Sequence, residues 1–232
     1  MGVSSNRPSA GGAVWALLVA AGTGERLGEE RPKAFVRLGE LPLLAEPLRR
    51  LEESSWIDAI VIAAPPGWEE PAILLAEELS AAKVVASVTG GPTRAESVRA
   101  ALAEVPDDAL VVLVHDAARP FVDDAVIERV LAPLSEGWDG VVPGLPLADT
   151  VKRVEADVVV ETVDRTGLVA IQTPQAFPAQ TLRSAYAGDL SGVTDCASLV
   201  EARGGHVRVV QGNVRLAKVT TPEDLERVSA WL

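Results

Sequence analysis

Two basic residues belong to the first glycine-rich segment of the sequence, AAGTGERLGEERPK. Arg26 follows Gly22 and Gly24, and Lys33 follows Gly28, so they can bring two cations to backbone N–H groups that point at one place. Such an arrangement suits a triphosphate, because fixed cations stabilise the charge that develops on phosphate oxygens during transfer. The glycines alone are a weak signal. Gly22, Gly24 and Gly28 match neither the Walker A loop nor the dinucleotide-binding fingerprint, and an ordinary turn between strand and helix also explains them.

The segment LVVLVHDAARPF places a carboxylate at the end of an apolar run. The run predicts a buried strand that carries Asp116 at its carboxyl end, with Arg119 just beyond it. A carboxylate at that place can hold a Mg²⁺ ion that bridges phosphates. Capping of the following turn explains Asp116 equally well when this segment is taken alone. His115 is interpreted as a structural histidine rather than a base.

The segment GGPTRAES is a third candidate. Gly90 and Gly91 allow a flat base to approach backbone amides, and the Ser97 hydroxyl can hydrogen-bond the edge of that base. The simpler alternative is the capped start of a helix, because Thr93 and Glu96 have capping-box spacing.

The elements that must position these residues are short apolar runs separated by segments of helical periodicity, such as LLAEPLRRLEES and ESVRAALAEV. This alternation predicts an α/β fold with a mainly parallel sheet and helices on both faces. Ligands of such sheets bind beyond the carboxyl ends of the strands, where the glycine loop and Asp116 lie. Thr221 with Pro222 predicts one further helix start, and Gly204 with Gly205 predicts a helix end. The predicted strands are AVWALLVA from Ala13, AIVIAA from Ala59, KVVASV from Lys83, LVVLVH from Leu110 and GVVPG from Gly140.

Residues 145–172 break this rhythm, because they alternate partly with a period of two and contain no amphipathic segment of helix length. The pattern predicts a β-arm that projects from the sheet. Since an isolated hairpin is only marginally stable, a second subunit is the natural surface for it, and we expect a homodimer. Residues 1–12 are small, polar and aperiodic, which predicts a flexible tail before a single domain over 13–232.

Composition limits the class of protein. The 232 residues, 48 % of them hydrophobic, suffice for one sizeable core. The net charge of -12 argues against nucleic acid or an anionic membrane as a partner. VWALLVAA is too short to span a bilayer. One cysteine and two histidines leave almost nothing for a zinc site and fit a reducing cytoplasm. A hydrolase built on Cys196 is disfavoured, because neither histidine lies in a segment that suggests pairing with it.

Seven segments occur in a familiar order: AAGTGERLGEERPK, GGPTRAESV, VHDAARP, DTVKR, VDRTGL, QTPQ and KVTTPEDL. With them the chain resembles the 2-C-methyl-D-erythritol 4-phosphate cytidylyltransferase family of the non-mevalonate isoprenoid pathway. The resemblance implies a Rossmann-like nucleotidyltransferase fold and a homodimer with interlocked arms. It also implies Mg²⁺-dependent transfer of CMP from CTP to a polyol phosphate.

The resemblance also implies roles for particular residues. Arg26 and Lys33 match the triphosphate loop, and Arg165 matches an arm residue that serves the neighbouring subunit. The implied catalytic positions are Arg26, Lys33, Arg165 and Lys218. The implied substrate-binding positions are Ala20, Ala21, Gly22, Gly91, Arg94, Ser97, Asp116, Arg119, Thr150, Thr173 and Thr194, with Asp116 also at the metal. Two features depart from the family pattern. The segment RLAK before Lys218 lacks an asparagine that is common there, and Cys196 stands at a position that is commonly acidic.

Several alternatives share parts of this pattern. A ribitol 5-phosphate cytidylyltransferase would share most of the motifs, because both acceptors are short polyol phosphates. A sugar-nucleotide pyrophosphorylase would use another nucleoside triphosphate. A non-catalytic nucleotide-binding module predicts loss of Arg26, Lys33 or Asp116, and all three are present.

Overall fold

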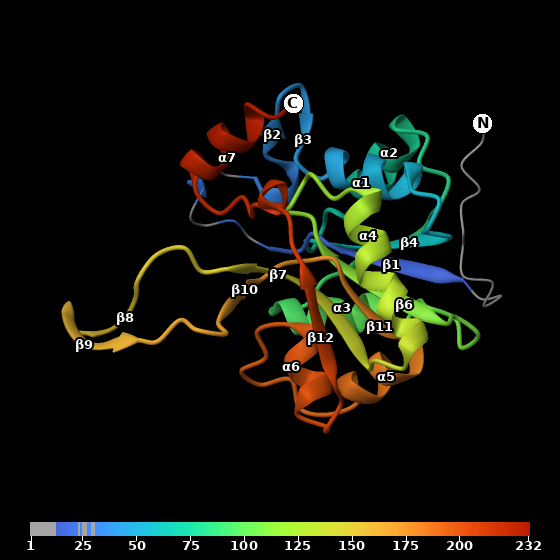
Figure 1. Cartoon of the computed structure of the whole chain (residues 1–232). Helices are drawn as coiled ribbons and strands as arrows, with labels where there is room; N and C mark the ends of the chain where they lie inside the picture. The colour runs from blue at the N-terminus through green and yellow to red at the C-terminus, as the bar shows by residue number, and fades with distance from the viewer. Residues whose placement is uncertain (1–12, 23, 25–26, 29–30) are drawn as a thin grey trace, which may run out of the picture.

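The computed structural model describes residues 13–22, 24, 27–28 and 31–232, so the predicted tail 1–12 lies outside the described residues. Within them, eight strands form a central sheet in the order β10-β7-β11-β6-β1-β4-β5, with β12 paired to β7 (Figure 1). These strands are β1 Val14–Val19, β4 Ala59–Ala64, β5 Val84–Thr89, β6 Val111–Asp116, β7 Gly140–Pro146, β10 Val169–Ile171, β11 Gln175–Pro178 and β12 Val207–Gln211.

The sheet is mainly parallel, as the apolar runs predict. Strand β1 pairs in parallel with β4 and β6, β4 with β5, and β12 with β7. The short strand β11 runs antiparallel between β6 and β7, and β10 runs antiparallel to β7. All five predicted strands are present. Strands β11 and β12 are also present, and the apolar runs of the sequence did not predict them.

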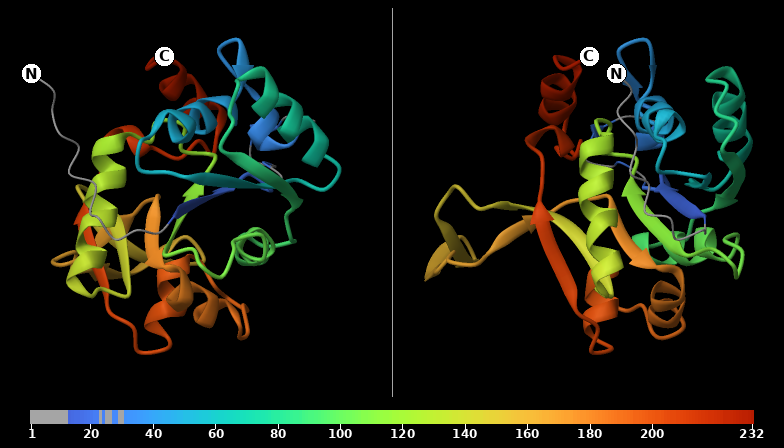
Figure 2. Two further views of the ribbon diagram at one scale, coloured as in Figure 1. Left: turned by 90° about the vertical axis from the view of Figure 1, so that its right-hand side faces the viewer. Right: turned by 45° about the vertical axis from the view of Figure 1, so that its right-hand side comes forward.

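Helices cover both faces of the sheet, which explains why the central strands are apolar without interruption. Ala16 and Leu18 of β1 belong to one apolar cluster, and Leu17 belongs to the cluster on the other face. Helices α1, α2 and α4 pack into the first cluster and α3, α5 and α6 into the second (Figure 2). Their bounds are α1 Ala45–Glu53, α2 Glu69–Glu78, α3 Arg94–Leu102, α4 Asp124–Leu131, α5 Ala179–Tyr186 and α6 Cys196–Glu201.

A third, smaller apolar cluster lies under the C-terminal helix α7, Pro222–Ser229, and contains Phe121, Val219 and Val228. The hairpin of β2, Arg37–Leu38, and β3, Leu41–Pro42, also contributes to it. The predicted cap is present, because the Thr221 side chain accepts from the backbone N–H of Asp224. Three 3-10 turns complete the described elements: η2 Lys33–Phe35, η3 Ala132–Glu136 and η4 Val214–Leu216.

The hairpin of β8, Val151–Glu155, and β9, Val158–Val163, stands away from the body of the protein (Figure 1). Its tip residues Ala156 and Asp157 have φ of 44° and 66°, as a two-residue type I′ turn requires. The arm predicted for 145–172 is shorter than expected. Residues 145–146 belong to β7 and 169–171 to β10, and these two strands pair within the central sheet, so only 147–168 project.

The outward side chains of the arm are unusually apolar for a surface. Val154, Val158, Val159 and Val160 are all exposed, at 49 % to 63 % of their full area.

No helix in the described part of the chain is long and apolar enough to cross a membrane.

Candidate active site

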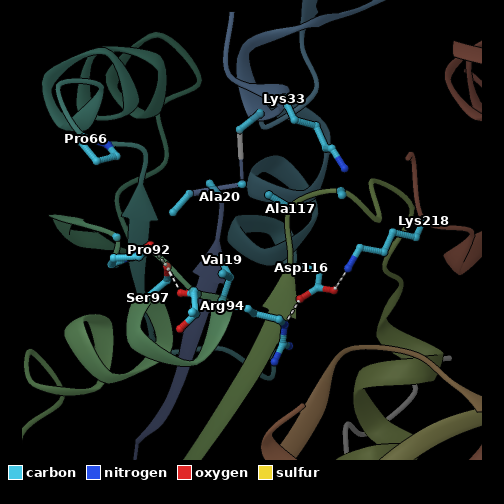
Figure 3. A pocket seen from close by; sticks show the side chains of 17 residues that line it. Val19, Ala20, Lys33, Pro66, Pro92, Arg94, Ser97, Asp116, Ala117 and Lys218 are labelled. Atoms are coloured by element: carbon cyan, nitrogen blue, oxygen red, sulfur yellow. Dashed lines mark hydrogen bonds and ion pairs between the residues drawn. The ribbon is translucent and has the colours of Figure 1, made fainter. Parts of the chain in front are cut away.

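A pocket of about 430 Å³ opens at the carboxyl ends of β1 and β6. Figure 3 shows the side chains around it, with Asp116 between Arg94 and Lys218 and with Lys33 above them in the view. The location agrees with the edge at which parallel α/β sheets bind ligands. The lining residues are Val19, Ala20, Ala21, Gly22, Lys33, Ala34, Pro66, Gly90, Gly91, Pro92, Thr93, Arg94, Ser97, Asp116, Ala117, Ala118 and Lys218.

Asp116 binds two cations from distant parts of the chain. Its Oδ1 accepts from Arg94 Nε at 2.8 Å, and its Oδ2 accepts from Lys218 Nζ at 2.9 Å. Burial by itself would raise the pKa of Asp116, but Arg94 and Lys218 hold it well below its usual value. Burial alone would lower the pKa of Arg94, whereas the Asp116 carboxylate raises it. Asp116 and Arg94 are therefore both ionised at neutral pH.

A second pocket, of about 500 Å³, shares Arg94, Asp116 and Lys218 with the first. The three charged side chains thus form a wall between two cavities. Arg119, Thr173 and Thr194 line only the second one. Two cavities that meet at one charged cluster suit a transfer between two bound substrates, because both can be oriented toward the same atoms.

Arg94 of the wall and Arg119 of the second pocket both keep unpaired donors. Arg94 Nη2 and Arg119 Nε are buried and lack a hydrogen-bond partner among the described residues. Arg119 Nε lies 4.0 Å from Asp116 Oδ2, which is too long for a hydrogen bond. Leaving a buried charged donor unpaired is costly, so these N–H groups are suited to an anionic ligand.

The GGPTR segment both caps a helix and lines the first pocket. Thr93 and Glu96 form the predicted capping box of α3, and Ser97 donates to the carbonyl oxygens of Thr93 and Gly91. A Cβ on Gly90 would lie 2.2 Å from the Ala21 Cβ, so only glycine allows this loop to pack against the first loop. The two glycine-rich segments therefore form one continuous wall.

Lys33 is half-buried at the start of η2 and lines the first pocket. Its Nζ donates to the Val219 carbonyl at 3.1 Å, one residue after Lys218. Arg26, the other cation predicted for this loop, lies outside the described residues.

The structure brings most of the predicted site residues together and leaves two apart. In the first pocket lie Ala20, Ala21, Gly22, Lys33, Gly91, Arg94, Ser97, Asp116 and Lys218. In the second lie Arg119, Thr173 and Thr194. Thr150 and Arg165, both at the base of the arm, line neither pocket, and Arg165 Nη1 donates to the Leu147 carbonyl.

His115 supports the cluster from behind. It is fully buried, and its Nε2 lies 2.9 Å from the Arg119 carbonyl, which can only accept. Nε2 therefore carries the proton, and Nδ1 accepts from Thr173 Oγ1 at 3.1 Å. Burial lowers the pKa of His115 to about 4. These contacts agree with the interpretation of His115 as structural.

Cys196 is buried beside Arg94, with its Sγ 3.6 Å from Arg94 Nη1 and 3.2 Å from Tyr186 Oη. Burial raises the pKa of the thiol, so Cys196 is neutral. Asp116 is then the one carboxylate that forms an ion pair with Arg94 among the described residues.

Sequence reasoning missed other residues of the second pocket, including Gln172, Gln175 and Asp195. Asp195 caps α6 and accepts from Gln175 Nε2 at 2.9 Å. The QTPQ motif and the Asp-x-x-Ser spacing before α6 were the available signals.

Asp116 is the residue of this site that suits a Mg²⁺ ion. The described residues contain no group of three or more histidine, cysteine, aspartate or glutamate side chains that could hold a metal ion by themselves. Mg²⁺ in phosphate sites is commonly bound by one or two carboxylates together with substrate phosphates. Asp116, ionised and at the wall of both pockets, fits a metal that is held mainly by its substrates.

The mainly parallel sheet and the cationic wall between two pockets define the class of protein, an α/β nucleotidyltransferase. The chain belongs to the 2-C-methyl-D-erythritol 4-phosphate cytidylyltransferase family, whose IspD model matches residues 14–232. This confirms the resemblance found in the sequence.

Individual relatives agree. The 2-C-methyl-D-erythritol 4-phosphate cytidylyltransferase of Nocardia farcinica is 47 % identical over 222 residues, covering 95 % of this chain and 94 % of that protein. The structure of the Francisella tularensis enzyme of this name has a TM-score of 0.81 at 28 % identity, covering 95 % and 100 % of the two chains. That from Thermus thermophilus has a TM-score of 0.75 at 32 % identity, with coverage of 93 % and 96 %. The predicted fold is thereby confirmed.

Proposed function

We propose that this chain is an enzyme that transfers CMP from CTP to 2-C-methyl-D-erythritol 4-phosphate. The products are pyrophosphate and 4-diphosphocytidyl-2-C-methyl-D-erythritol, an intermediate of non-mevalonate isoprenoid biosynthesis. The family to which the chain belongs supports this substrate pair. The observation that carries the proposal is the Arg94–Asp116–Lys218 cluster, which two pockets share.

The reaction is an in-line displacement at the α-phosphorus of CTP. An oxygen of the acceptor phosphate forms the new bond to this phosphorus, and the bond from the α-phosphorus to the oxygen bridging it to the β-phosphorus breaks, so that pyrophosphate leaves with the electron pair. A phosphate monoester has a second pKa of about 6, so the acceptor is already an anionic nucleophile at neutral pH. No general base is required, which agrees with the buried, neutral state of His115.

The two pockets divide the substrates between them. The first is the proposed CTP site, with Gly91 and Ser97 toward the cytosine and Lys33 toward the triphosphate. Arg26, which lies outside the described residues, keeps its predicted role at the triphosphate as a proposal from the sequence. The second is the proposed acceptor site, with Arg119 and the hydroxyls of Thr173 and Thr194 toward the polyol phosphate.

Lys218 and Arg94 lie between the two sites, where their charges can stabilise the negative charge that builds up on the transferred phosphate. Asp116 holds both cations in place before substrates bind, so no reorganisation is needed during the reaction. When bound, Mg²⁺ would neutralise phosphate charge and assist the departure of pyrophosphate, and Asp116 is the residue proposed to contact it.

The arm is the proposed contact between two subunits. Its exposed valines Val154, Val158, Val159 and Val160 are an apolar surface that the rest of the described chain leaves open, and a second copy of the chain can cover it. Arg165 and Thr150, which line neither pocket of their own subunit, are proposed to serve the partner's acceptor site. The buried thiol of Cys196 suits a reducing compartment, and the cytoplasm is the proposed location.

The test is a product assay with purified protein, CTP, Mg²⁺ and one polyol phosphate at a time. The rate of pyrophosphate release is the quantity measured. We expect turnover with 2-C-methyl-D-erythritol 4-phosphate and far less with ribitol 5-phosphate. ATP, GTP and UTP replace CTP in parallel reactions. Turnover with ribitol phosphate alone would overturn the acceptor, and turnover with another nucleotide alone would overturn the donor. Binding of CTP without turnover on either acceptor would favour the non-catalytic alternative.

A further inference from the structure

Gln172 connects the foot of the arm to the segment that carries Lys218. It follows β10 directly and is 6 % exposed. Its side-chain Oε1 accepts from the backbone N–H of Asn213 at 3.0 Å, and its Nε2 donates to the backbone carbonyl of Asn213, also at 3.0 Å. The orientation of the amide is determined by these bonds, because the reverse orientation would oppose donor to donor and acceptor to acceptor. One side chain thus binds a whole residue of backbone 41 positions away.

The local backbone is built around this amide clamp, meaning the two hydrogen bonds between Gln172 and Asn213. A Cβ on Gly212 would lie 2.3 Å from Gln172 Oε1, so a larger residue would displace the amide. Gln172 is itself anchored, because its backbone N–H donates to the Pro143 carbonyl of β7 at 2.8 Å. The clamp therefore fixes the backbone of Asn213 relative to the central sheet.

From Asn213 the chain leads directly to Lys218. The Asn213 side chain accepts from the Arg215 N–H and so starts the turn η4, and its Nδ2 donates to Asp123 Oδ2 at 3.2 Å. The turn ends at Leu216, which is fully buried and whose carbonyl accepts from Arg119 Nη1 at 2.6 Å. Lys218 follows two residues later.

Apart from its hydrogen bond to Asp116, the Lys218 side chain has few constraints. Its side chain is 41 % exposed, and it lies between η4 and α7, outside any helix or strand. Beyond it, the Val219 N–H donates to the Ala118 carbonyl at 2.8 Å. A long, half-exposed lysine has considerable rotamer freedom, so the placement of its ammonium beside Asp116 depends on how firmly the backbone is held on both sides.

We propose that Gln172 is a positioning residue that holds the Lys218 ammonium at the wall between the two pockets, through its two hydrogen bonds to Asn213. This role rests on the proposed function of Lys218 in the transfer. A group misplaced by about 1 Å can cost about 100-fold in rate. We therefore expect Gln172→Met, which keeps the length and loses both hydrogen bonds, to lower kcat about 10- to 100-fold.

The competing explanation is direct contact with the acceptor, since Gln172 also lines the second pocket. The two roles differ in kinetics. A positioning role lowers kcat and leaves the KM for the acceptor within about twofold, whereas loss of a uniform binding contact raises that KM with kcat unchanged. They also differ in the Lys218→Ala background, because positioning has no effect when the positioned ammonium is absent.

The experiment measures wild type, Gln172→Met, Lys218→Ala and the double variant by single-turnover formation of product from radiolabelled CTP, using concentrated enzyme. Gln211→Met is the matched control, because Gln211 is an exposed glutamine at the end of β12 and lines neither pocket. Thermal melting and circular dichroism establish that each variant is folded. We expect the Gln172 substitution to have less than a twofold effect in the Lys218→Ala background.

Three results would overturn the inference. The first is full kcat in folded Gln172→Met, and the second is a raised acceptor KM as the main effect of that substitution. The third is a rate that the Gln172 substitution lowers by the same factor whether or not Lys218 is present. If Gln172→Met does not fold, Gly212→Ala gives the same test from the other side of the clamp, because its Cβ would lie 2.3 Å from Gln172 Oε1 and would displace the amide while leaving Gln172 in the sequence. Full kcat of folded Gly212→Ala would equally count against the inference. Absence of product from the wild type is a different outcome, since it refutes the proposed function rather than the role of Gln172.

Discussion

The buried histidine behind the ion cluster is expected to make folding stability depend on pH. His115 is fully buried and hydrogen-bonded at both ring nitrogens, to the Arg119 carbonyl and to Thr173 Oγ1. Burial lowers its pKa from 6.5 to about 4. The perturbation is therefore a change of pH from 7 to 5, compared between the wild type and a variant that lacks this ring.

The sign follows from proton counting. Between pH 6.5 and about 4 the unfolded chain binds a proton at His115 and the folded chain does not. The free energy of unfolding therefore falls as the pH falls through this window. Each pH unit inside the window is worth about 1.4 kcal/mol, so the contribution of His115 between pH 7 and pH 5 is a loss of about 2 kcal/mol.

The assay is urea unfolding at pH 7, 6 and 5 at one protein concentration, with tryptophan fluorescence as the probe of unfolding. His115→Gln keeps one donor and one acceptor but does not titrate, so its unfolding free energy should lose about 2 kcal/mol less over the same pH range. His206→Gln removes the other histidine of the sequence, whose side chain is 83 % exposed, and is the matched control. Parallel pH profiles for wild type and His115→Gln would refute the reasoning, whatever their absolute stabilities.

The other predictions concern the two substrate pockets. Asp116→Asn should lower kcat by about 100- to 1000-fold in saturating Mg²⁺, because the amide leaves two cations of the wall without their counter-charge. Arg165→Ala and Lys33→Ala should each be inactive. A mixture of the two variants that is allowed to exchange subunits should regain activity. If Arg165 serves the neighbouring subunit, one active site of each heterodimer carries both substitutions and the other site carries neither. Gly90→Ala should lower the free energy of unfolding by about 1–3 kcal/mol in urea titrations and weaken CTP binding in calorimetry, because its Cβ would lie 2.2 Å from that of Ala21.

Each of these has a result that contradicts it. Full activity of folded Asp116→Asn would make that carboxylate structural only. No gain of activity on mixing, with exchange verified by native mass spectrometry, would assign Arg165 to its own subunit. Unchanged stability and CTP affinity of Gly90→Ala would show that the two glycine-rich loops move apart freely.

Much of the fold can be predicted from the sequence, because the relevant signals are local. A strand covered on both faces is apolar without interruption, as in AIVIAA, and a capping box needs only residues three positions apart, as at Thr93 and Glu96. Strand β11 was not predicted, since it has four residues and ends in proline. Strand β12 was not predicted either, because among the described strands it pairs with β7 alone and it exposes alternate residues.

For the site as well, local signals identify single residues but not which of them come together. The types and motifs of Asp116, Arg94 and Lys218 marked them as candidates, and the strand ending at Asp116 indicated one edge of the sheet. Their combination is a property of the tertiary structure alone. Lys218 lies 102 positions from Asp116 and Arg94 lies 22 positions from it, so no local spacing relates them.

Gln172 illustrates what only the folded chain decides. By itself it is one glutamine of a QTPQ motif, and no periodicity or capping rule assigns it a partner. The pairing of β12 with β7 brings Gly212 beside Gly144, and the missing side chain at Gly212 leaves the space that the Gln172 amide occupies. Residue types and local patterns therefore determined the buried apolar strands, the caps and the candidate charges. The relative positions of those charges depended on sheet pairing between distant segments, because hydrogen bonds and ion pairs form only between groups that the whole fold has brought within about 3 Å of each other.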